Sequence, residues 1–238
     1  MLDLDGTLVD TLGDFEVALA AMLRQLGRAP LPREAVACMI GKGSEHLVES
    51  ALQATRAAQA PEADAALFDQ AWQLYQEAYG RINGRHSAVY PGVVDGLKAL
   101  KALGLPLAVL TNKPQAYARE LVAAKRLDGY FEHVFGGDSF ARKKPDPLPL
   151  VQTCLALGTP VGRTLMIGDS SNDALAARAA GCPVVLVSYG YNHGQPVGEV
   201  DADGCFDRLD DLAAALAPTT ACKPRPDPAA RPSGPRRR

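Results

Sequence analysis

The sequence opens with MLDLDGTLVD at residues 1–10, and the interpretation of the whole chain starts from this stretch. Asp3 and Asp5 are one residue apart, and alternate side chains of an extended strand share a face, so both carboxylates are expected to point into one cavity. Gly6 permits a tight turn after them, and Thr7 adds a hydroxyl and a free amide. Two acids this close repel each other unless a cation or a shared proton relieves them. The stretch therefore indicates a reactive site with a bound cation or a shared proton, although an isolated D-x-D-G is as often a solvated turn.

The bulk composition is that of a globular protein without a membrane span. The chain has 238 residues, of which 47% are hydrophobic and 22% charged, and no apolar run approaches the roughly 18 residues of a membrane helix. Its five cysteines lack metal-type spacing, which favours reduced thiols and a cytoplasmic location. The net charge of −2 divides into +5 over residues 218–238 and −7 over the rest. A body that acidic argues against binding to nucleic acid.

Residues 13–87 are predicted to form a self-contained helical unit. Apolar residues recur at helical spacing from Asp14 to Leu26, with Asp14 placed to cap the helix and Gly27 to end it, and a longer helix is expected over 62–82. From Val89 onward, short apolar runs at 105–110, 165–167 and 184–187 alternate with helical patterns near 93–102, 115–125, 147–157 and 172–180. This alternation predicts a Rossmann-like parallel sheet with helices on both faces. The Pro- and Arg-rich residues 218–238 are expected to be disordered.

Three more chemical stretches each follow a predicted strand, at the sheet edge where ligands bind in such folds. Thr111 and Asn112 follow the strand at 105–110, although such residues are more often a simple helix cap. Lys144 lies before Pro145, and a second proline at 147 also restricts the backbone, which would aim the ammonium rather than leave it as a solvated surface charge.

Two further acids are expected at the same edge of the sheet. Asp169 ends the strand at 165–167 and Asp173 lies four residues later, where capping of the next helix is the simpler explanation. Taken together, however, four acids, a lysine and a hydroxyl at one sheet edge require a hard divalent cation. A site with oxygen ligands, of which the protein supplies only a few, favours Mg²⁺.

DLDGTLVD, LTNKP, KKPDP and GDSSND, in this order, resemble the four motifs of the haloacid dehalogenase superfamily, over residues 1–217. The connecting sequence, including YPGV and SYGYNHG, is similar to that of the phosphoglycolate phosphatases within it. The resemblance implies an α/β fold with a hydrolase core at 1–12 and 88–217 and an inserted helical cap at 13–87. It also implies Asp3 as the nucleophile that forms an aspartyl-phosphate, and Asp5 as the general acid and base.

The same resemblance implies which residues would hold the metal and which would bind the phosphoryl group. Mg²⁺ would be held by Asp3, the backbone carbonyl of Asp5 and Asp169, while Asp173 would orient Lys144 or a metal-bound water. The loop of Gly6 and Thr7, together with Thr111, Asn112 and Lys144, would bind the substrate's phosphoryl group. None of the four histidines is expected to be catalytic.

The cap would close over the site and select the substrate. Lys42, between two glycines, is the candidate for a substrate-facing cap residue, with a solvated turn as the alternative. The expected partner is a small phosphate ester, most simply 2-phosphoglycolate, with the protein acting as a monomer or homodimer. A sugar or nucleotide phosphatase, a phosphomutase and a non-catalytic binding protein on the same fold remain open.

The first strand departs from the family pattern, because only Met1 and Leu2 precede Asp3. So short a strand loses apolar burial and pairing in the middle of the sheet. We expect that adding residues upstream of Met1 would raise stability and activity, and equal melting temperatures and turnover for the two forms would contradict this.

Overall fold

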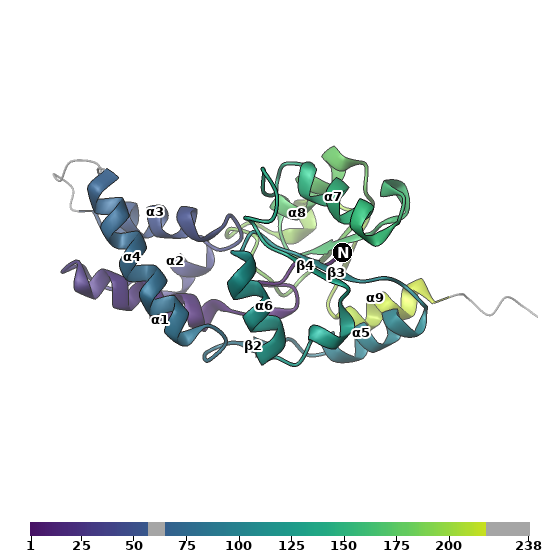
Figure 1. Ribbon diagram of the computed structural model, residues 1–238, viewed down its shortest axis with the longest axis horizontal. Coiled ribbons are helices and arrows are strands. Elements are labelled where there is room, and N and C mark those ends of the chain that lie inside the picture. The colour runs from purple at the N-terminus through teal and green to yellow at the C-terminus, as the bar shows by residue number, and fades with distance from the viewer. Residues whose placement is uncertain (57–64, 218–238) are drawn as a thin grey trace, which may run out of the picture.

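The computed structural model describes residues 1–56 and 65–217. A group of four helices lies at one end of the molecule and an α/β part at the other, with the first residues of the chain running into the middle of the α/β part (Figure 1). Among the described helices, none has both the length and the apolar character that a membrane crossing requires.

A parallel sheet forms the centre of the α/β part. The pairing order is β4, β3, the segment at Leu2, β5, β6 and β7, and every described pair in this sheet is parallel. Leu2 bridges Val109 on one side and Ile167 on the other, so the start of the chain is the central strand, as short as the sequence indicated. The strands are β3 (Ala108–Leu110), β4 (His133–Phe135), β5 (Met166–Gly168), β6 (Val184–Val187) and β7 (Gly204–Phe206).

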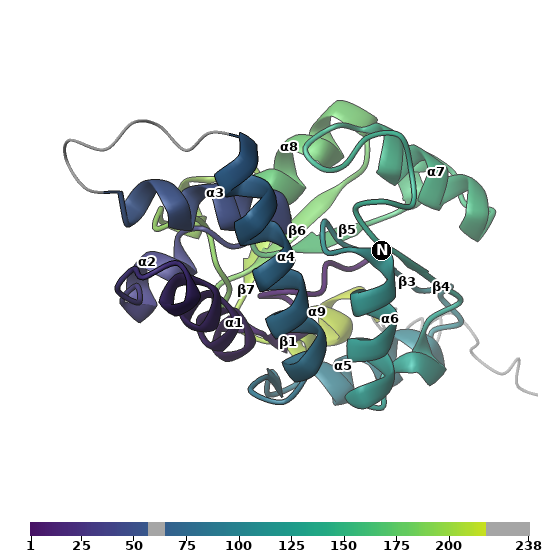
Figure 2. The ribbon, with the colours of Figure 1, turned by 60° about the vertical axis from the view of Figure 1, so that its left-hand side comes forward.

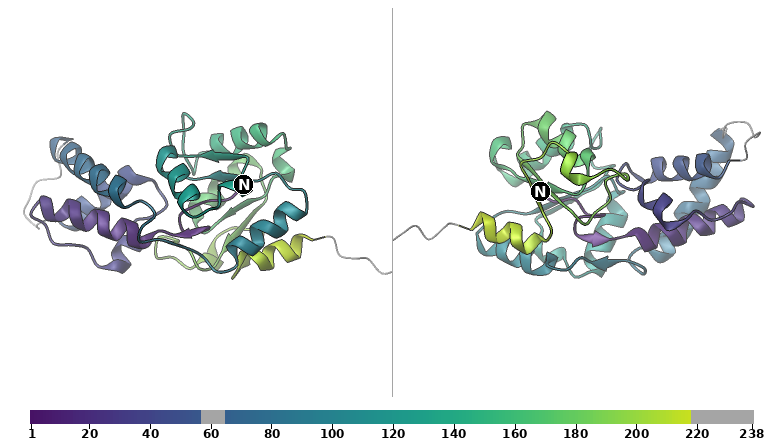
Figure 3. Two further views of the ribbon diagram at one scale, coloured as in Figure 1. Left: turned by 60° about the horizontal axis from the view of Figure 1, so that its bottom comes forward. Right: turned by 180° about the vertical axis from the view of Figure 1, so that it is seen from behind.

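Helices cover both faces of this sheet, as the apolar runs predicted (Figures 1 and 3). Because strand side chains alternate between faces, neighbouring residues enter different cores. Leu2, Val109 and Ile167 pack with α5 (Val93–Ala102), α6 (Gln115–Ala124) and α9 (Leu209–Leu216). Met1, Leu110 and Met166 pack on the other face with α7 (Leu148–Leu157) and α8 (Ser171–Ala180). Leu2 is fully buried, which contributes about 1.5–3 kcal/mol.

The inserted helical part has a separate apolar core. Its helices are α1 (Leu12–Gln25), α2 (Arg33–Ala37), α3 (Ser44–Ala54) and α4 (Ala65–Ile82), seen side by side in Figure 2. Phe15 of α1 stacks on Tyr79 of α4, with ring centroids 5.5 Å apart, and Tyr75 also stacks on Tyr79. These rings are almost completely buried and lie where the helices approach the sheet edge.

Two short strands connect the helical part to the core. β1 (Val9–Asp10) pairs antiparallel with β2 (Ala88–Val89), so the outgoing and returning segments lie against each other. Tyr191 holds this junction from the core side, because its hydroxyl accepts hydrogen bonds from the amides of Thr11 and Leu12 and donates one to Asp10.

The expected capping role of Asp14 is wrong. Helix α1 begins at Leu12 with Thr11 as its N-cap residue, and Asp14 lies inside the first turn. Its fully buried carboxylate instead accepts hydrogen bonds from the amides of Gly84 at 2.8 Å and His86 at 2.7 Å. Asp14 therefore joins the start of the helical part to its return segment, a contact between distant residues that helix periodicity cannot indicate.

The other predicted elements lie close to their expected positions. The strand expected at 105–110 is confined to Ala108–Leu110, and the edge strands β4 and β7 and the helix α9 were not predicted. The start of the helix expected over 62–82 and the tail at 218–238 lie outside the described residues.

Candidate active site

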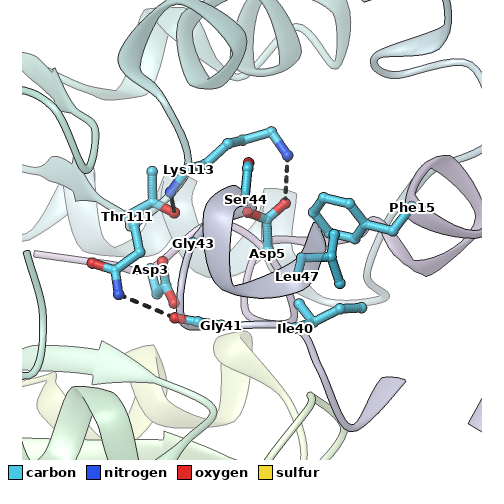
Figure 4. Close-up of a pocket in the computed structure, with 11 residues that line it drawn as sticks. Asp3, Asp5, Phe15, Ile40, Gly41, Gly43, Ser44, Leu47, Thr111 and Lys113 are labelled. Carbon is cyan, nitrogen blue, oxygen red and sulfur yellow. Dashed lines mark hydrogen bonds and ion pairs between the residues drawn. The ribbon is translucent and has the colours of Figure 1, made fainter. Parts of the chain in front are cut away.

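Asp3 and Asp5 lie at the carboxyl end of the central strand and line one pocket, as their spacing predicted (Figure 4). Both are nearly buried, with 5% and 8% of their surface exposed. The Asp3 carboxylate also accepts a hydrogen bond from the amide of Leu4 at 2.7 Å, which fixes its direction. The backbone then turns at Gly6, whose φ of +85° favours glycine.

Lys144 reaches the same point from the loop before α7. Its ammonium lies 3.2 Å from Asp3 Oδ1 and 2.5 Å from Asp173 Oδ1, and it donates to the carbonyl of Leu110 at 2.9 Å. Burial alone would lower the pKa of Lys144, but Asp173 and Asp3 raise it above its usual value. The structure therefore brings Lys144, Asp3 and Asp173 together, and the lysine is a fixed cation.

Asp169, which follows β5, completes an acidic cluster. Carboxylate oxygens of Asp3, Asp169 and Asp173 all lie within 4.8 Å of one another. Asp169 is held by the hydroxyl of Thr7, which donates to it at 2.9 Å, and by the amide of Tyr191 at 2.6 Å. Thr7 therefore contacts Asp169, and any contact it makes with substrate is additional to this one.

The cluster carries more negative charge than the protein neutralises. Burial raises the pKa of Asp3 to about 7, opposed by Lys144 and reinforced by Asp173 and Asp5. Burial and the charges of Asp173 and Asp3 raise the pKa of Asp169 well above its usual value. Three buried carboxylates converging on one point, with oxygen donors only, fit a hard divalent cation such as Mg²⁺. Asp173 was expected to orient Lys144 or a metal-bound water. Its carboxylate also belongs to this group of three acids, and it helps to cap α8.

The loop after β3 supplies Thr111 and Asn112 to the same region. Thr111 lines the pocket, and its hydroxyl accepts a 3.3 Å hydrogen bond from the amide of Lys113. Helix α6 begins at Gln115, as expected, and Pro114 is its N-cap residue, so the alternative that Thr111 and Asn112 are a simple helix cap is wrong. The Asn112 side chain is instead paired twice with the backbone of Lys144, at 3.0 and 2.8 Å, so it positions the lysine loop.

The helical part closes over the pocket. The carbonyl of Gly41, just before α3, accepts hydrogen bonds from the side-chain amides of Asn112 and Asn172, both at 3.1 Å. Glu45 of α3 also pairs with Lys143 of the core at 2.8 Å. These contacts join the two parts in the closed arrangement.

Lys42 is not among the residues that line the pocket of Asp3 and Asp5. It lines a separate, more open groove at the junction of the two parts, together with His46, Asn172 and His193. A role for Lys42 in contacting substrate remains a prediction, and it would require a substrate that extends into this groove.

Sequence reasoning assigned no role to Lys113, which the structure places inside the pocket. Its ammonium lies 3.0 Å from Asp5 Oδ1, and only 3% of the residue is exposed. Its neighbours Thr111 and Asn112 were singled out, and a lysine before a proline in that loop was the available signal. What the sequence could not show is that two aromatic rings of the helical part cover this lysine.

The motifs, their order and their convergence match a known family. The family model of the haloacid dehalogenase-like hydrolases matches residues 1–181. The chain belongs to the haloacid dehalogenase-like hydrolase family.

Other hydrolases of this family are similar over nearly the whole chain. The phosphoglycolate phosphatase of Thiobacillus denitrificans is 44% identical over 213 residues, covering 90% of this chain and 92% of that protein. That of Nitrosospira multiformis is 45% identical over 209 residues, covering 88% and 91%. A crystal structure of a predicted phosphoglycolate phosphatase from Haemophilus somnus superposes with a TM-score of 0.86 at 33% identity, covering 90% of this chain and 95% of the other.

Proposed function

We propose that this hydrolase is a Mg²⁺-dependent phosphatase that converts 2-phosphoglycolate to glycolate and phosphate through an aspartyl-phosphate. The observation that carries the proposal is the position of Asp3, beside the ammonium of Lys144 and close to the carboxylates of Asp169 and Asp173, with Asp5 in the same pocket. The names of the similar phosphatases support the choice of substrate.

Asp3 would attack phosphorus and displace the glycolate oxygen. A nucleophilic carboxylate must be ionised at neutral pH, and Lys144 favours that form, while burial opposes it. A bound Mg²⁺, held by Asp3, Asp169 and the carbonyl of Asp5, would neutralise the charges of the two reacting anions. The hydroxyl of Thr111 would bind an oxygen of the phosphoryl group, and the positive charge of Lys144 beside Asp3 would attract this group.

Asp5 would act on the other side of the phosphorus atom. Its carboxyl would protonate the leaving alkoxide and then accept a proton from the water that hydrolyses the aspartyl-phosphate. Asp5 lines the pocket beside Asp3 and contacts the helical part through Lys113. Closure of the helical part over this pocket would exclude bulk water during the first step.

The test is phosphate release from a panel of phosphate esters, including 2-phosphoglycolate, sugar phosphates and nucleotides, with and without Mg²⁺. We expect Mg²⁺-dependent turnover that is fastest on 2-phosphoglycolate. Asp3→Asn should abolish turnover while the protein remains folded. Turnover by Asp3→Asn would exclude Asp3 as the nucleophile, and a stronger preference for another ester would reassign the substrate.

A further inference from the structure

The roles assigned to the pocket leave one charged group without a function, the ammonium of Lys113. Among the described residues that line the pocket, Lys113 is the one with a positive charge (Figure 4). It approaches from the loop after β3, and its ammonium lies 3.0 Å from Asp5 Oδ1. A nearly buried ammonium is costly unless it is paired or serves a ligand.

The two lysines of the site differ in how fully their donors are used. An ammonium has three donors. Lys144 directs its donors at Asp173, the carbonyl of Leu110 and Asp3. Lys113 has one hydrogen-bond acceptor among the described residues, the carboxylate of Asp5. It therefore retains the capacity to bind a further acceptor inside the pocket.

Two aromatic rings of the helical part lie close to this ammonium. Lys113 Nζ lies 4.6 Å from the ring centroid of Phe15 and 4.7 Å from that of Tyr79. The ring faces stabilise the cation by cation–π interaction but accept no strong hydrogen bond. Because the lysine belongs to the core and the rings to α1 and α4, this arrangement is complete only when the two parts are closed on each other.

We propose that Lys113 binds a carboxylate on the leaving group of the substrate. This rests on the proposed function, in which Asp5 meets the oxygen that links phosphorus to the leaving group. In 2-phosphoglycolate a single methylene separates that oxygen from the carboxylate. A substrate with its ester oxygen at Asp5 therefore carries its carboxylate into the surroundings of Asp5, and the ammonium of Lys113 lies there.

A substrate with a carboxylate on its leaving group needs a positive charge in the pocket. A carboxylate entering the pocket approaches Asp3 and Asp5, and like charges repel strongly where water is excluded. Lys113 is the pocket-lining cation that offsets this repulsion, since the ammonium of Lys144 is directed at Asp3 and Asp173. The side chains of the helical part that line the pocket come from Ile40, Leu47 and Phe15, which are apolar, and from Ser44, the one polar side chain among them. Three apolar side chains and one hydroxyl suit a short carbon chain better than a sugar with several hydroxyls. The site would therefore select phosphate esters of short hydroxy acids.

The test compares 2-phosphoglycolate with 2-hydroxyethyl phosphate, which has a similar length but no carboxylate. The quantity measured is the ratio of kcat/KM for the two esters with the Mg²⁺-loaded enzyme. We expect the wild type to prefer 2-phosphoglycolate, and Lys113→Met to reduce the ratio by roughly 10- to 100-fold. Lys113→Gln serves as a second variant if Lys113→Met is poorly folded. Lys98→Met, which removes an exposed lysine of α5 that does not line the pocket, should leave the ratio unchanged.

The outcomes separate this inference from the function on which it rests. If Lys113 only positions Asp5, both esters lose kcat/KM equally, the ratio is unchanged, and the inference is overturned while the phosphatase stands. A wild type that hydrolyses both esters equally well overturns the inference without any variant. A wild type that hydrolyses no phosphate ester in the presence of Mg²⁺ overturns the proposed function as well.

Discussion

Gly6 provides a test of how closely the turn after Asp5 fits the acidic cluster. A Cβ built at Gly6 would lie 2.3 Å from Asp169 Oδ2 and 2.9 Å from a ring carbon of Tyr191. The backbone there also has φ of +85°, a region that L-residues seldom adopt. Gly6→Ala therefore combines two separate penalties, backbone strain and a steric clash with a proposed metal ligand.

Two other glycines separate these penalties. Gly27 has φ of +69° and no atom within 4 Å of a built Cβ, so Gly27→Ala carries the backbone penalty alone, about 1–2 kcal/mol. At Gly190 a Cβ would lie 2.2 Å from Asp169 Cβ, and φ lies outside the positive region, so Gly190→Ala carries the clash alone, about 1–3 kcal/mol. Gly6→Ala should lose roughly the sum, about 2–5 kcal/mol in free energy of unfolding.

Urea unfolding of the three variants measures the stability terms, and activation by Mg²⁺ measures the position of Asp169. Gly27→Ala should need the same Mg²⁺ concentration for half-maximal activity as the wild type. Gly6→Ala and Gly190→Ala should need more Mg²⁺ and lose on the order of 100-fold in kcat/KM, because a shift of about 1 Å in a catalytic group has that effect. The reasoning is refuted if Gly6→Ala matches Gly27→Ala in both stability and Mg²⁺ dependence.

Three further predictions concern the junction and the charge of the cluster. Asp14→Ala leaves two backbone amides without their buried acceptor and should cost about 2–5 kcal/mol in urea unfolding, whereas Glu16→Ala, which removes an exposed ion pair, should cost under about 1 kcal/mol. Equal losses would contradict the assigned contact. Asn172→Ala removes a hydrogen bond between core and cap, so KM for 2-phosphoglycolate should rise roughly threefold to tenfold with little change in kcat, and an unchanged KM would show that this contact does not favour closure. The raised pKa values of Asp3 and Asp169 mean that the folded state keeps protons which the unfolded chain releases near its ordinary pKa of 3.8, so the metal-free protein should lose stability as pH rises from about 4 to 7. Thermal unfolding should therefore show a larger stabilisation by Mg²⁺ at pH 8 than at pH 5, and a stabilisation independent of pH would contradict this.

The parts of the site that the sequence predicted are those fixed by strand geometry. Parallel strands end at one edge, so Thr111 and Asp169 could be placed near Asp3 once the apolar runs were recognised, whereas no predicted apolar run precedes Lys144 and its place was implied by the resemblance to the family. Alternation along the strand likewise brought Asp3 and Asp5 into one pocket. These predictions needed only local spacing and the direction of the strands.

The parts that the sequence did not predict depend on contacts between the helical part and the core. Lys113 acquires its surroundings from Phe15 and Tyr79, which are far from it in the chain. Asp14 was interpreted as a helix cap because its actual partners, the amides that follow α4, are about 70 residues away. The edge strands β4 and β7 were missed because they are only partly buried and do not form a continuous apolar run, unlike β3 and β5, which have the same length and are fully buried.

The formal charges of the site match the charge of the proposed Mg²⁺. Asp3, Asp5, Asp169 and Asp173 carry four formal negative charges, and the ammonium groups of Lys113 and Lys144 carry two positive ones. The excess of two negative charges equals the charge of one divalent cation.

The two lysines lie at different places in the site and would bind different parts of the substrate. Lys144, beside Asp3, lies where the phosphoryl group would bind, while Lys113, beside Asp5, lies where the leaving group would depart. In this proposal the Asp3–Lys144 pair lies at the phosphoryl end of the substrate and the Asp5–Lys113 pair lies at its leaving-group end. A substrate whose leaving group carries a second negative charge would therefore meet one lysine at each charged end. An ester with an uncharged leaving group would use only the first, and this is the physical basis for expecting selection of a phosphorylated hydroxy acid.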